Sequence, residues 1–259
     1  NQPLYSLGIT GVFTKDLDIA LLNNEIDIAV HSLKDVPTIL PQNIEVSAVL
    51  ERDFPQDVLV RKSSSKNKDL SELKIATSSL RRRAFWSEKF PNTQFSDIRG
   101  NVQTRLKKLE EGDFDATLFS LAGIKRMEME LEYEMLDFMI SAPSQGVVAI
   151  SSRVDDVETK AILQKINHKT TQICVEIERN FLRTLEGGCT APIGAIAVFE
   201  ENKIKFSGRL NSLDGSKTIN VVEEFEYDDS ENYGKKFAEF VLENGGKEMM
   251  EEIKKQIKE

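Results

Sequence analysis

The sequence of 259 residues is poor in cysteine and histidine, with two of each. Cys174 falls within a predicted helix and Cys189 in a predicted loop, so no disulfide framework is expected and a reducing compartment fits. The two histidines, His31 and His168, are best explained as structural, with His31 hydrogen-bonded inside a buried strand. A hydrolase with a cysteine nucleophile therefore lacks an obvious base. No metal site is expected.

The chain also lacks long apolar runs and the common phosphate-binding loops. No stretch approaches the ~18 apolar residues that suggest a membrane span, and no leader of charged, apolar and small residues opens the sequence. Neither a P-loop pattern nor a glycine-rich dinucleotide pattern after a strand occurs. The net charge of −9 argues against nucleic acid as a partner. We expect a cytoplasmic protein that does not enter membranes.

What is present is the alternation of strands and helices that is typical of α/β proteins. A unit of strand, polar turn and helix repeats from Lys74 onward, which predicts parallel strands. Alternating runs within residues 194–225 predict an antiparallel meander, followed by a closing helix. The expected domains are residues 1–52 with 147–168, residues 56–143, and residues 172–259. Because the chain opens on a glycine-containing loop, we also expect residues to precede Asn1.

Lys34 and Asp35 are the first candidate site residues. They follow the apolar run Ile26–Val30, and ligands of open α/β sheets gather at the carboxyl ends of strands. We interpret the pair as part of a binding or catalytic site. The alternative is an ion pair in a surface loop.

Arginines recur near the turns of the repeated units. Arg81 and Arg82 would stand in the first turn of a helix for which Thr77, Ser78 and Ser79 are candidate N-caps. Cations there oppose the helix dipole, and an anionic ligand would relieve that cost. The alternative is a solvated basic face.

Arg99, Arg105 and Arg126 come from the next two units. Since parallel strands end along one edge of a sheet, all of these arginines are expected to converge on one crevice for a polycarboxylate or a polyphosphate. Arginine favours the carboxylate, because its planar fork binds two oxygens at once.

The second cysteine lies in the stretch LEGGCTAPI, residues 185–193. The glycine pair predicts a helix end with an open loop, and Pro192 stops any helical continuation. Cys189 is therefore a candidate functional thiol, although a packed small hydrophobic residue is the commoner fate of a cysteine.

Six segments carry a family resemblance when they are taken together. They are HSLKDVP (31–37), TSSLRRR (77–83), RGNVQTRL (99–106), LAGIKRM (121–127), APSQG (142–146) and LEGGCTAPIG (185–194). In this order, and over the whole chain, they closely resemble the porphobilinogen deaminase, or hydroxymethylbilane synthase, family. Each motif alone is weak, whereas the combination is highly specific.

The resemblance implies a transferase of tetrapyrrole (heme) biosynthesis. Such an enzyme joins four porphobilinogen molecules head to tail, releases ammonia each time and hydrolyses off linear hydroxymethylbilane. It implies a dipyrromethane cofactor bound through a thioether to Cys189, and a monomer. The implied fold has three α/β domains. The first two are periplasmic-binding-protein-like with mixed, mainly parallel sheets, and the third is a small α+β domain with an antiparallel three-stranded sheet.

The resemblance also implies residue roles. Asp35 matches the catalytic aspartate, whose carboxylate would stabilise the cationic azafulvene formed when an aminomethylpyrrole loses ammonia. Cysteine 189 aside, the residues that match cofactor- and substrate-binding positions are Phe13, Lys34, Thr77, Ser78, Ser79, Arg81, Arg82, Arg99, Gly100, Arg105, Arg126 and Gln145.

Two departures from the family and one alternative function accompany this interpretation. Most members begin with a strand and an Arg/Ser-containing turn that have no counterpart here, so the chain is expected to lack that N-terminal strand. Ser6 and Thr10 stand where some members carry lysines. The alternative is a non-enzymatic two-domain protein that binds carboxylates or oxyanions, which would leave the loop of Cys189 unexplained.

Overall fold

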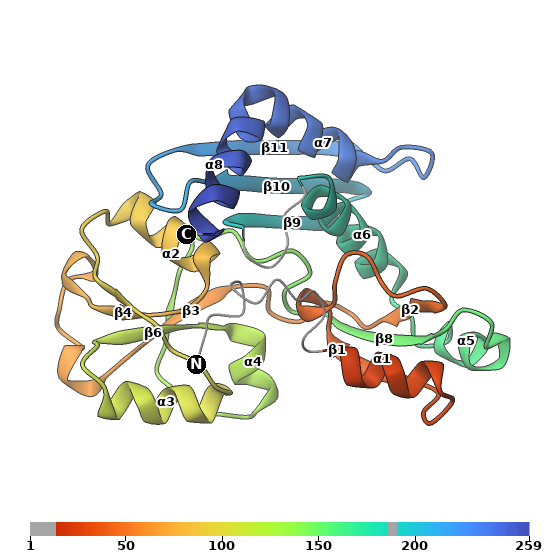
Figure 1. Ribbon diagram of the computed structural model, residues 1–259, viewed down its shortest axis with the longest axis horizontal. Coiled ribbons are helices and arrows are strands. Elements are labelled where there is room, and N and C mark those ends of the chain that lie inside the picture. Colours follow the sequence, from red (N-terminus) through yellow and green to blue (C-terminus); the bar gives the residue numbers. More distant parts are fainter. Residues whose placement is uncertain (1–13, 186–190, 259) are drawn as a thin grey trace.

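The computed structural model describes residues 14–185 and 191–258, and it arranges them as three sheets with helices packed around them (Figure 1). The mixed α/β character predicted from the sequence is confirmed. No helix among these residues is long and apolar enough to cross a membrane.

The first sheet has the order β1-β8-β2. Its central strand comes from a distant part of the chain and runs antiparallel to both neighbours. Two helices accompany the sheet, and Leu21, Ala29 and Ile44 form one of its small apolar clusters. The elements are α1 (Lys15–Leu22), β1 (Ala29–Ser32), β2 (Ile44–Val49), β8 (Val148–Arg153) and α5 (Val157–Leu163). A short 3₁₀ turn, η2 (Leu33–Asp35), follows β1 directly.

The second sheet has the order β5-β4-β6-β3-β7. Strand β4 is parallel to β5 and β6, whereas β3 is antiparallel to β6 and β7. The elements are β3 (Asp57–Arg61), η3 (Ser63–Ser65), η4 (Leu70–Glu72), β4 (Ile75–Ala76), α2 (Leu80–Lys89), β5 (Phe95–Ser96), α3 (Val102–Glu111), β6 (Ala116–Ser120), α4 (Leu121–Arg126) and β7 (Glu134–Met135). Trp86 and Phe85 of α2 fill one side of its core.

The expectation of mainly parallel sheets needs correction. Among the described strands, the first sheet contains only antiparallel pairs, and the second contains both kinds. Parallel pairing holds where α2 connects β4 to β5, and β6, which follows after α3, also pairs parallel to β4. The segment of residues 127–147 instead carries the chain back to the first sheet, and β8 then enters it antiparallel. Helical spacing in the sequence predicts the helical connection within a sheet, but it does not predict the return of the chain to another sheet.

The third sheet, β11-β10-β9, is the predicted antiparallel meander. Phe181, Phe206 and Phe237 pack against one another beneath it. The predicted closing helix is interrupted at Gly245 and Gly246, where Gly245 has φ 97°. The elements are α6 (Lys169–Thr184), β9 (Ile193–Glu200), β10 (Lys203–Asn211), β11 (Thr218–Glu226), α7 (Tyr233–Val241), η5 (Leu242–Gly246) and α8 (Lys247–Lys258).

Buried Glu178 on α6 ties the three sheets together. Its carboxylate accepts hydrogen bonds from Arg52 Nη2 at 2.6 Å, from the Ser144 amide at 2.6 Å and from the Ala197 amide at 2.8 Å. Burial raises the pKa of this carboxyl, while Arg52 and the two amides oppose that effect. Arg52 and Ser144 belong to the connections between the first two sheets, and Ala197 belongs to β9 of the third sheet, so Glu178 links all three sheets.

Candidate active site

The site forms at one edge of the second sheet. Because β3 runs antiparallel to β6, its first residue, Asp57, lies opposite Ser120 at the end of β6. Strand β4, parallel to β6, ends nearby at Ala76. A carboxylate therefore stands at the carboxyl edge of two parallel strands, where α/β sheets bind ligands.

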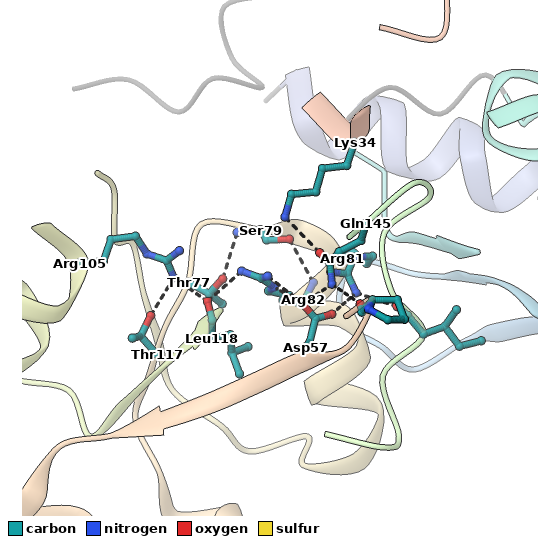
Figure 2. Close-up of polar contacts among 12 residues, drawn as sticks. Lys34, Asp57, Thr77, Ser79, Arg81, Arg82, Arg105, Thr117, Leu118 and Gln145 are labelled. Carbon is teal, nitrogen blue, oxygen red and sulfur yellow. Dashed lines mark hydrogen bonds and ion pairs between the residues drawn. The ribbon is translucent and has the colours of Figure 1, made fainter. Parts of the chain in front are cut away.

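Asp57 is fully enclosed and holds two arginines (Figure 2). Arg81 Nη1 lies 2.7 Å from Oδ2, and Arg82 Nη2 and Nε lie 2.8 and 3.0 Å from Oδ1. Burial alone would raise the pKa of this carboxyl, but the two guanidinium groups hold it well below its usual range. Asp57 is not among the site residues that the sequence predicted.

Asp57 also changes the interpretation of the α2 N-terminus. Ser79 is the N-cap, as one of the three candidates, and its Oγ accepts from the Arg82 amide at 3.4 Å. The cost of placing Arg81 and Arg82 in this first turn is offset by the buried carboxylate of Asp57. The position of these arginines does not by itself require an anionic ligand.

Arg105 supplies a stronger indication of an anionic ligand. Its Nη2 donates to Thr117 Oγ1 at 3.0 Å and to the Leu118 carbonyl at 2.6 Å, and its guanidinium lies 4.3 Å from the centre of the Phe119 ring. Its buried Nε has no hydrogen-bond partner, and no carboxylate of the described residues pairs with it. Burial, and then the charge of Arg82, lower its pKa to about 9, so it stays protonated at neutral pH.

Lys34 reaches the same cluster from the first sheet. Its Nζ donates to Gln145 Oε1 at 3.2 Å, and Gln145 Nε2 donates to Asp57 Oδ1 at 3.2 Å (Figure 2). Gln145 therefore bridges the turn after β1 and the edge of the second sheet. Part of the Lys34 side chain is accessible to solvent, yet burial of its ammonium group, followed by the charge of Arg82, lowers its pKa to about 8.

Asp35 lies beside Lys34 in η2, with its side chain open to solvent. Although exposed, its carboxyl has enough protein around it that desolvation raises its pKa, while Lys34, Arg82 and His31 oppose this rise. The expected hydrogen bonding of His31 is not found at Nε2, which is buried without a partner. The carboxylate of Asp35 is therefore close enough to Lys34 and Arg82 for their charges to lower its pKa against the effect of desolvation.

This cluster contains more cations than carboxylates, and their charges act on one another. The cations are Lys34, Arg81, Arg82 and Arg105, and the carboxylates are Asp35 and Asp57. Partly buried cations that outnumber the carboxylates repel one another, and this repulsion is stronger in a medium of low dielectric than in water. An anionic ligand with carboxylates would remove that excess.

The remaining predicted residues lie around this cluster. Thr77 is buried, and its Oγ1 accepts from the Ser79 amide, while Ser78 Oγ bonds to both the carbonyl and the amide of Ile98. Gly100 has φ 121°, and an added Cβ would lie 2.6 Å from the Thr104 side chain, so glycine is required in this turn.

The five arginines do not all meet. Arg82 and Arg105 donate to the same Leu118 carbonyl, next to Arg81. Arg126 instead donates to the Gly146 carbonyl at 2.7 Å and pairs with Asp53 at 3.4 Å. The half-buried Arg99 precedes α3, and its carbonyl accepts from Lys108.

Two predicted site residues, Phe13 and Cys189, lie outside the described residues. Cys174 and His168 are structural, as expected: His168 is the N-cap of α6, and burial raises the pKa of the Cys174 thiol to about 12. Within residues 14–185 and 191–258, no group of three or more His, Cys, Asp or Glu side chains is placed to hold a metal ion.

Solved structures that are similar over part of the chain include an ancestral cationic amino acid solute binding protein, with a TM-score of 0.37 and 18% identity over 59% of this chain and 66% of that one. A VFT2 domain of BvgS from Bordetella pertussis has a TM-score of 0.37 and 15% identity over the same shares. Both similarities are weak, and the fold is defined by its own three sheets.

Similarity in sequence is much stronger. A protein from Methanocaldococcus jannaschii named "Probable porphobilinogen deaminase" is 51% identical over 78% of this chain and 69% of its own length. The porphobilinogen deaminase of Desulfitobacterium hafniense is 40% identical over 97% of this chain and 82% of its own. The family description "Porphobilinogen deaminase, dipyromethane cofactor binding domain" matches residues 1–161, and the description of the family's C-terminal domain matches residues 172–243. The chain therefore belongs to the porphobilinogen deaminase family.

Proposed function

We propose that this chain polymerises four porphobilinogen molecules into hydroxymethylbilane, with release of ammonia, on a covalently bound dipyrromethane primer. The observation that carries the proposal is the excess of buried cations around Asp57, with Asp35 within reach of the charges of Lys34 and Arg82. Every pyrrole of substrate and product bears an acetate and a propionate, so a growing chain brings carboxylates that need such a cluster. A non-enzymatic carboxylate-binding protein would use the cations but would leave Asp35 without a role.

The cationic cluster fits the dipyrromethane cofactor. Its carboxylates would meet Arg105, whose Nε has no partner, and Lys34, whose pKa is lowered partly because cations surround it. Arg81 and Arg82, Thr77, Ser78, Ser79, Arg99, Gly100, Arg126, Gln145 and Phe13 complete the proposed binding set. When bound, the cofactor supplies the free pyrrole carbon to which the first substrate unit is joined.

Asp35 is proposed to stabilise the deamination step. The protonated amine of porphobilinogen leaves as ammonia with the electron pair of its C–N bond, and the pyrrole is left as a cationic azafulvene. A carboxylate that accepts a hydrogen bond from the pyrrole N–H stabilises this cation most strongly at the moment when the charge develops. Lys34, Arg82 and His31 oppose the effect of desolvation on Asp35, which favours the ionised form that this role requires.

Cys189 is proposed to hold the primer through a thioether. It follows α6 and precedes β9, and β9 contacts the connection between the first two sheets through the Ala195 amide, which donates to the Ser141 carbonyl at 3.0 Å. We further propose a cytoplasmic monomer without a nucleic-acid partner. Its domains would be residues 1–52 with 147–168, residues 56–143 and residues 172–259, each built around one of the three sheets.

Intact mass and turnover test the proposal together. The purified protein, denatured and weighed, should carry an adduct of two pyrrole units on the peptide that contains Cys189, and it should convert porphobilinogen to hydroxymethylbilane with release of ammonia. Cys189→Ala should lack both the adduct and the turnover. Cys174→Ala is the matched control, since that thiol is buried and should affect neither.

Separate outcomes would overturn separate parts of this proposal. A free thiol at Cys189 in a protein that turns over porphobilinogen would overturn the tether. An intact adduct without any turnover would overturn the catalytic function and favour a binding protein.

A pH dependence follows from Lys34. Its ammonium is charged below its pKa of about 8 and neutral above it, so its contact with a substrate carboxylate is lost as the pH rises through that value. If catalysis requires the charged form of Lys34, kcat/KM should decline above pH 8, by about tenfold for each further pH unit. Bound cofactor carboxylates would favour the charged form and move this decline upward.

The matched variant is Lys34→Arg, which keeps a charge that does not titrate in this range. Its kcat/KM should be lower at pH 7 because the shape differs, but its ratio between pH 7 and pH 9 should stay near one. An unchanged alkaline decline in this variant would assign the titration to another group.

A further inference from the structure

We propose that Arg179 is a positioning residue for catalysis, because it fixes the turn of residues 33–37 that carries Lys34 and Asp35. This inference depends on the proposed function of Asp35. Arg179 lies on α6, outside the cationic cluster and outside every motif that carried the family resemblance. It would act through the backbone of this turn, called here the Asp35 turn, and would not touch substrate.

Arg179 donates three hydrogen bonds to the Asp35 turn. Its Nη1 donates to the Leu33 carbonyl at 3.4 Å and to the Val36 carbonyl at 3.0 Å, and its Nη2 donates to the Pro37 carbonyl at 2.6 Å. These carbonyls stand on both sides of Asp35 in the chain. One guanidinium therefore holds the backbone immediately before and after the catalytic carboxylate.

The chemistry of the turn explains why arginine suits this position. Residues 33–35 form a 3₁₀ turn in which the Leu33 carbonyl already accepts from the Val36 amide at 3.1 Å. The carbonyls of Val36 and Pro37 lie just after this turn, where carbonyls carry partial negative charge and need donors from outside the turn. The planar guanidinium presents several N–H groups in a fixed fork and can satisfy several such carbonyls at once. A lysine ammonium is a point charge and cannot hold the same arrangement.

Packing makes the attachment firm. Leu33 and Val36 of the Asp35 turn are buried in one cluster with Val175 of α6. Val175 precedes Arg179 by four residues and so lies on the same face of α6. This face therefore combines an apolar contact with hydrogen bonds to the Asp35 turn. The Leu33 amide, which donates to the Val147 carbonyl at 2.9 Å, adds a contact to the first sheet.

Helix α6 thus holds two parts of the site from adjacent residues. Glu178 holds the Ser144 amide and Arg52, next to Gln145, whereas Arg179 holds the Asp35 turn. The same helix leads directly toward the segment that contains Cys189. It is consequently the element that relates the proposed tether to the proposed catalytic carboxylate.

The expected consequence is a loss in kcat rather than in binding. The guanidinium groups of Arg81, Arg82 and Arg105 are held by Asp57, Thr117 and the carbonyls of Leu118 and Ile140. Because these partners lie outside the Asp35 turn, the groups proposed to bind carboxylates should stay in place. A displacement of a catalytic group by about 1 Å can lower a rate by ~10²-fold. For Arg179→Gln we expect kcat to fall by about 10- to 100-fold, with KM changed by less than about threefold.

The experiment compares holoenzyme variants in the porphobilinogen assay, with the adduct mass verified for each. Arg179→Lys should lie close to Arg179→Gln, because charge without the fork does not hold the Asp35 turn. Arg183→Gln is the matched control one turn further along α6, where the exposed Arg183 donates to Oδ1 of half-buried Asn180 at 2.6 Å. That variant should keep wild-type kcat and KM.

Chemical rescue separates positioning from a purely structural role. Arg179→Ala should regain part of its lost kcat when millimolar guanidinium ion is added, and ammonium ion should give no gain. Arg179 variants that keep wild-type kcat would overturn the proposal. A loss of kcat that follows the fraction of unfolded protein and is not restored by guanidinium ion would overturn it as well. If wild-type protein with an intact adduct fails to turn over porphobilinogen, the proposed function fails first, and the two failures are distinguishable.

Discussion

Asp35→Asn should lower kcat by about 10³-fold or more, while the protein keeps its fold and its dipyrromethane adduct. Asparagine has nearly the shape of aspartate but carries no charge, so it loses the electrostatic stabilisation of the cationic azafulvene. Losing a preorganised charge or donor at a reacting centre typically costs ~10²- to 10³-fold in rate, and loss of proton transfer costs ~10²- to 10⁴-fold. This is the largest effect on catalysis that we expect from one substitution.

The structure makes this prediction specific. The side chain of Asp35 is open to solvent and is not part of the buried ion pairs around Asp57, so its replacement should cost little folding free energy. KM should change little, since Lys34 and the arginines remain. Steady-state kinetics and intact mass give the test. Asp16→Asn, an exposed aspartate in the first turn of α1, is the matched control. An active Asp35→Asn enzyme would remove Asp35 from the mechanism.

The elements of the fold were predictable because their signals are local. The N-cap of α2 and the antiparallel meander each depend on residues within a few positions of one another. Cys174 was also correctly placed in a helix, and it lies buried in α6. The domain boundaries stay predictions.

Asp57 could not be found in the same way. Its position beside Arg81 and Arg82 depends on β3 running antiparallel to β6, which places the start of β3 at the ends of β4 and β6. Helical and strand periodicity do not fix strand direction between distant segments. The local signal was an acidic residue directly before the apolar run Val58–Val60, where a charge is buried only if it is paired.

The same limit applies to the arginines. The sequence predicted five cations at one crevice, and three are together while Arg126 contacts the connection at Gly146. Two of these three, Arg81 and Arg82, donate to Asp57. The sequence interpretation had assigned those N–H groups to a ligand. Arg179 shows the opposite case, because nothing in its local pattern distinguishes a helix-surface arginine from one that holds a distant turn.

Asp57→Asn should be the most destabilising single substitution in the site. It leaves Arg81 and Arg82 buried, at 6% and 8% exposure, without a counter-charge. Breaking a buried ion pair from one side costs about 3–5 kcal/mol, because the remaining charge is neither solvated nor paired. Asp97→Asn is the matched control. Asp97 pairs with Arg83 near the surface, and such a pair contributes less than about 1 kcal/mol. Urea unfolding at pH 7 measures both.

The pH dependence of this difference identifies its cause. The pKa of Asp57 is lower in the folded protein than in the unfolded chain, where it is ~4. Its stabilisation is therefore fully present above pH ~4 and is lost as the pH falls further, since the unfolded state then takes up the proton first. The gap in unfolding free energy between the wild type and Asp57→Asn should narrow below pH 4. A gap that stays constant with pH would point to lost shape and hydrogen bonding. In that case the charge of Asp57 would not be what holds the arginine pair.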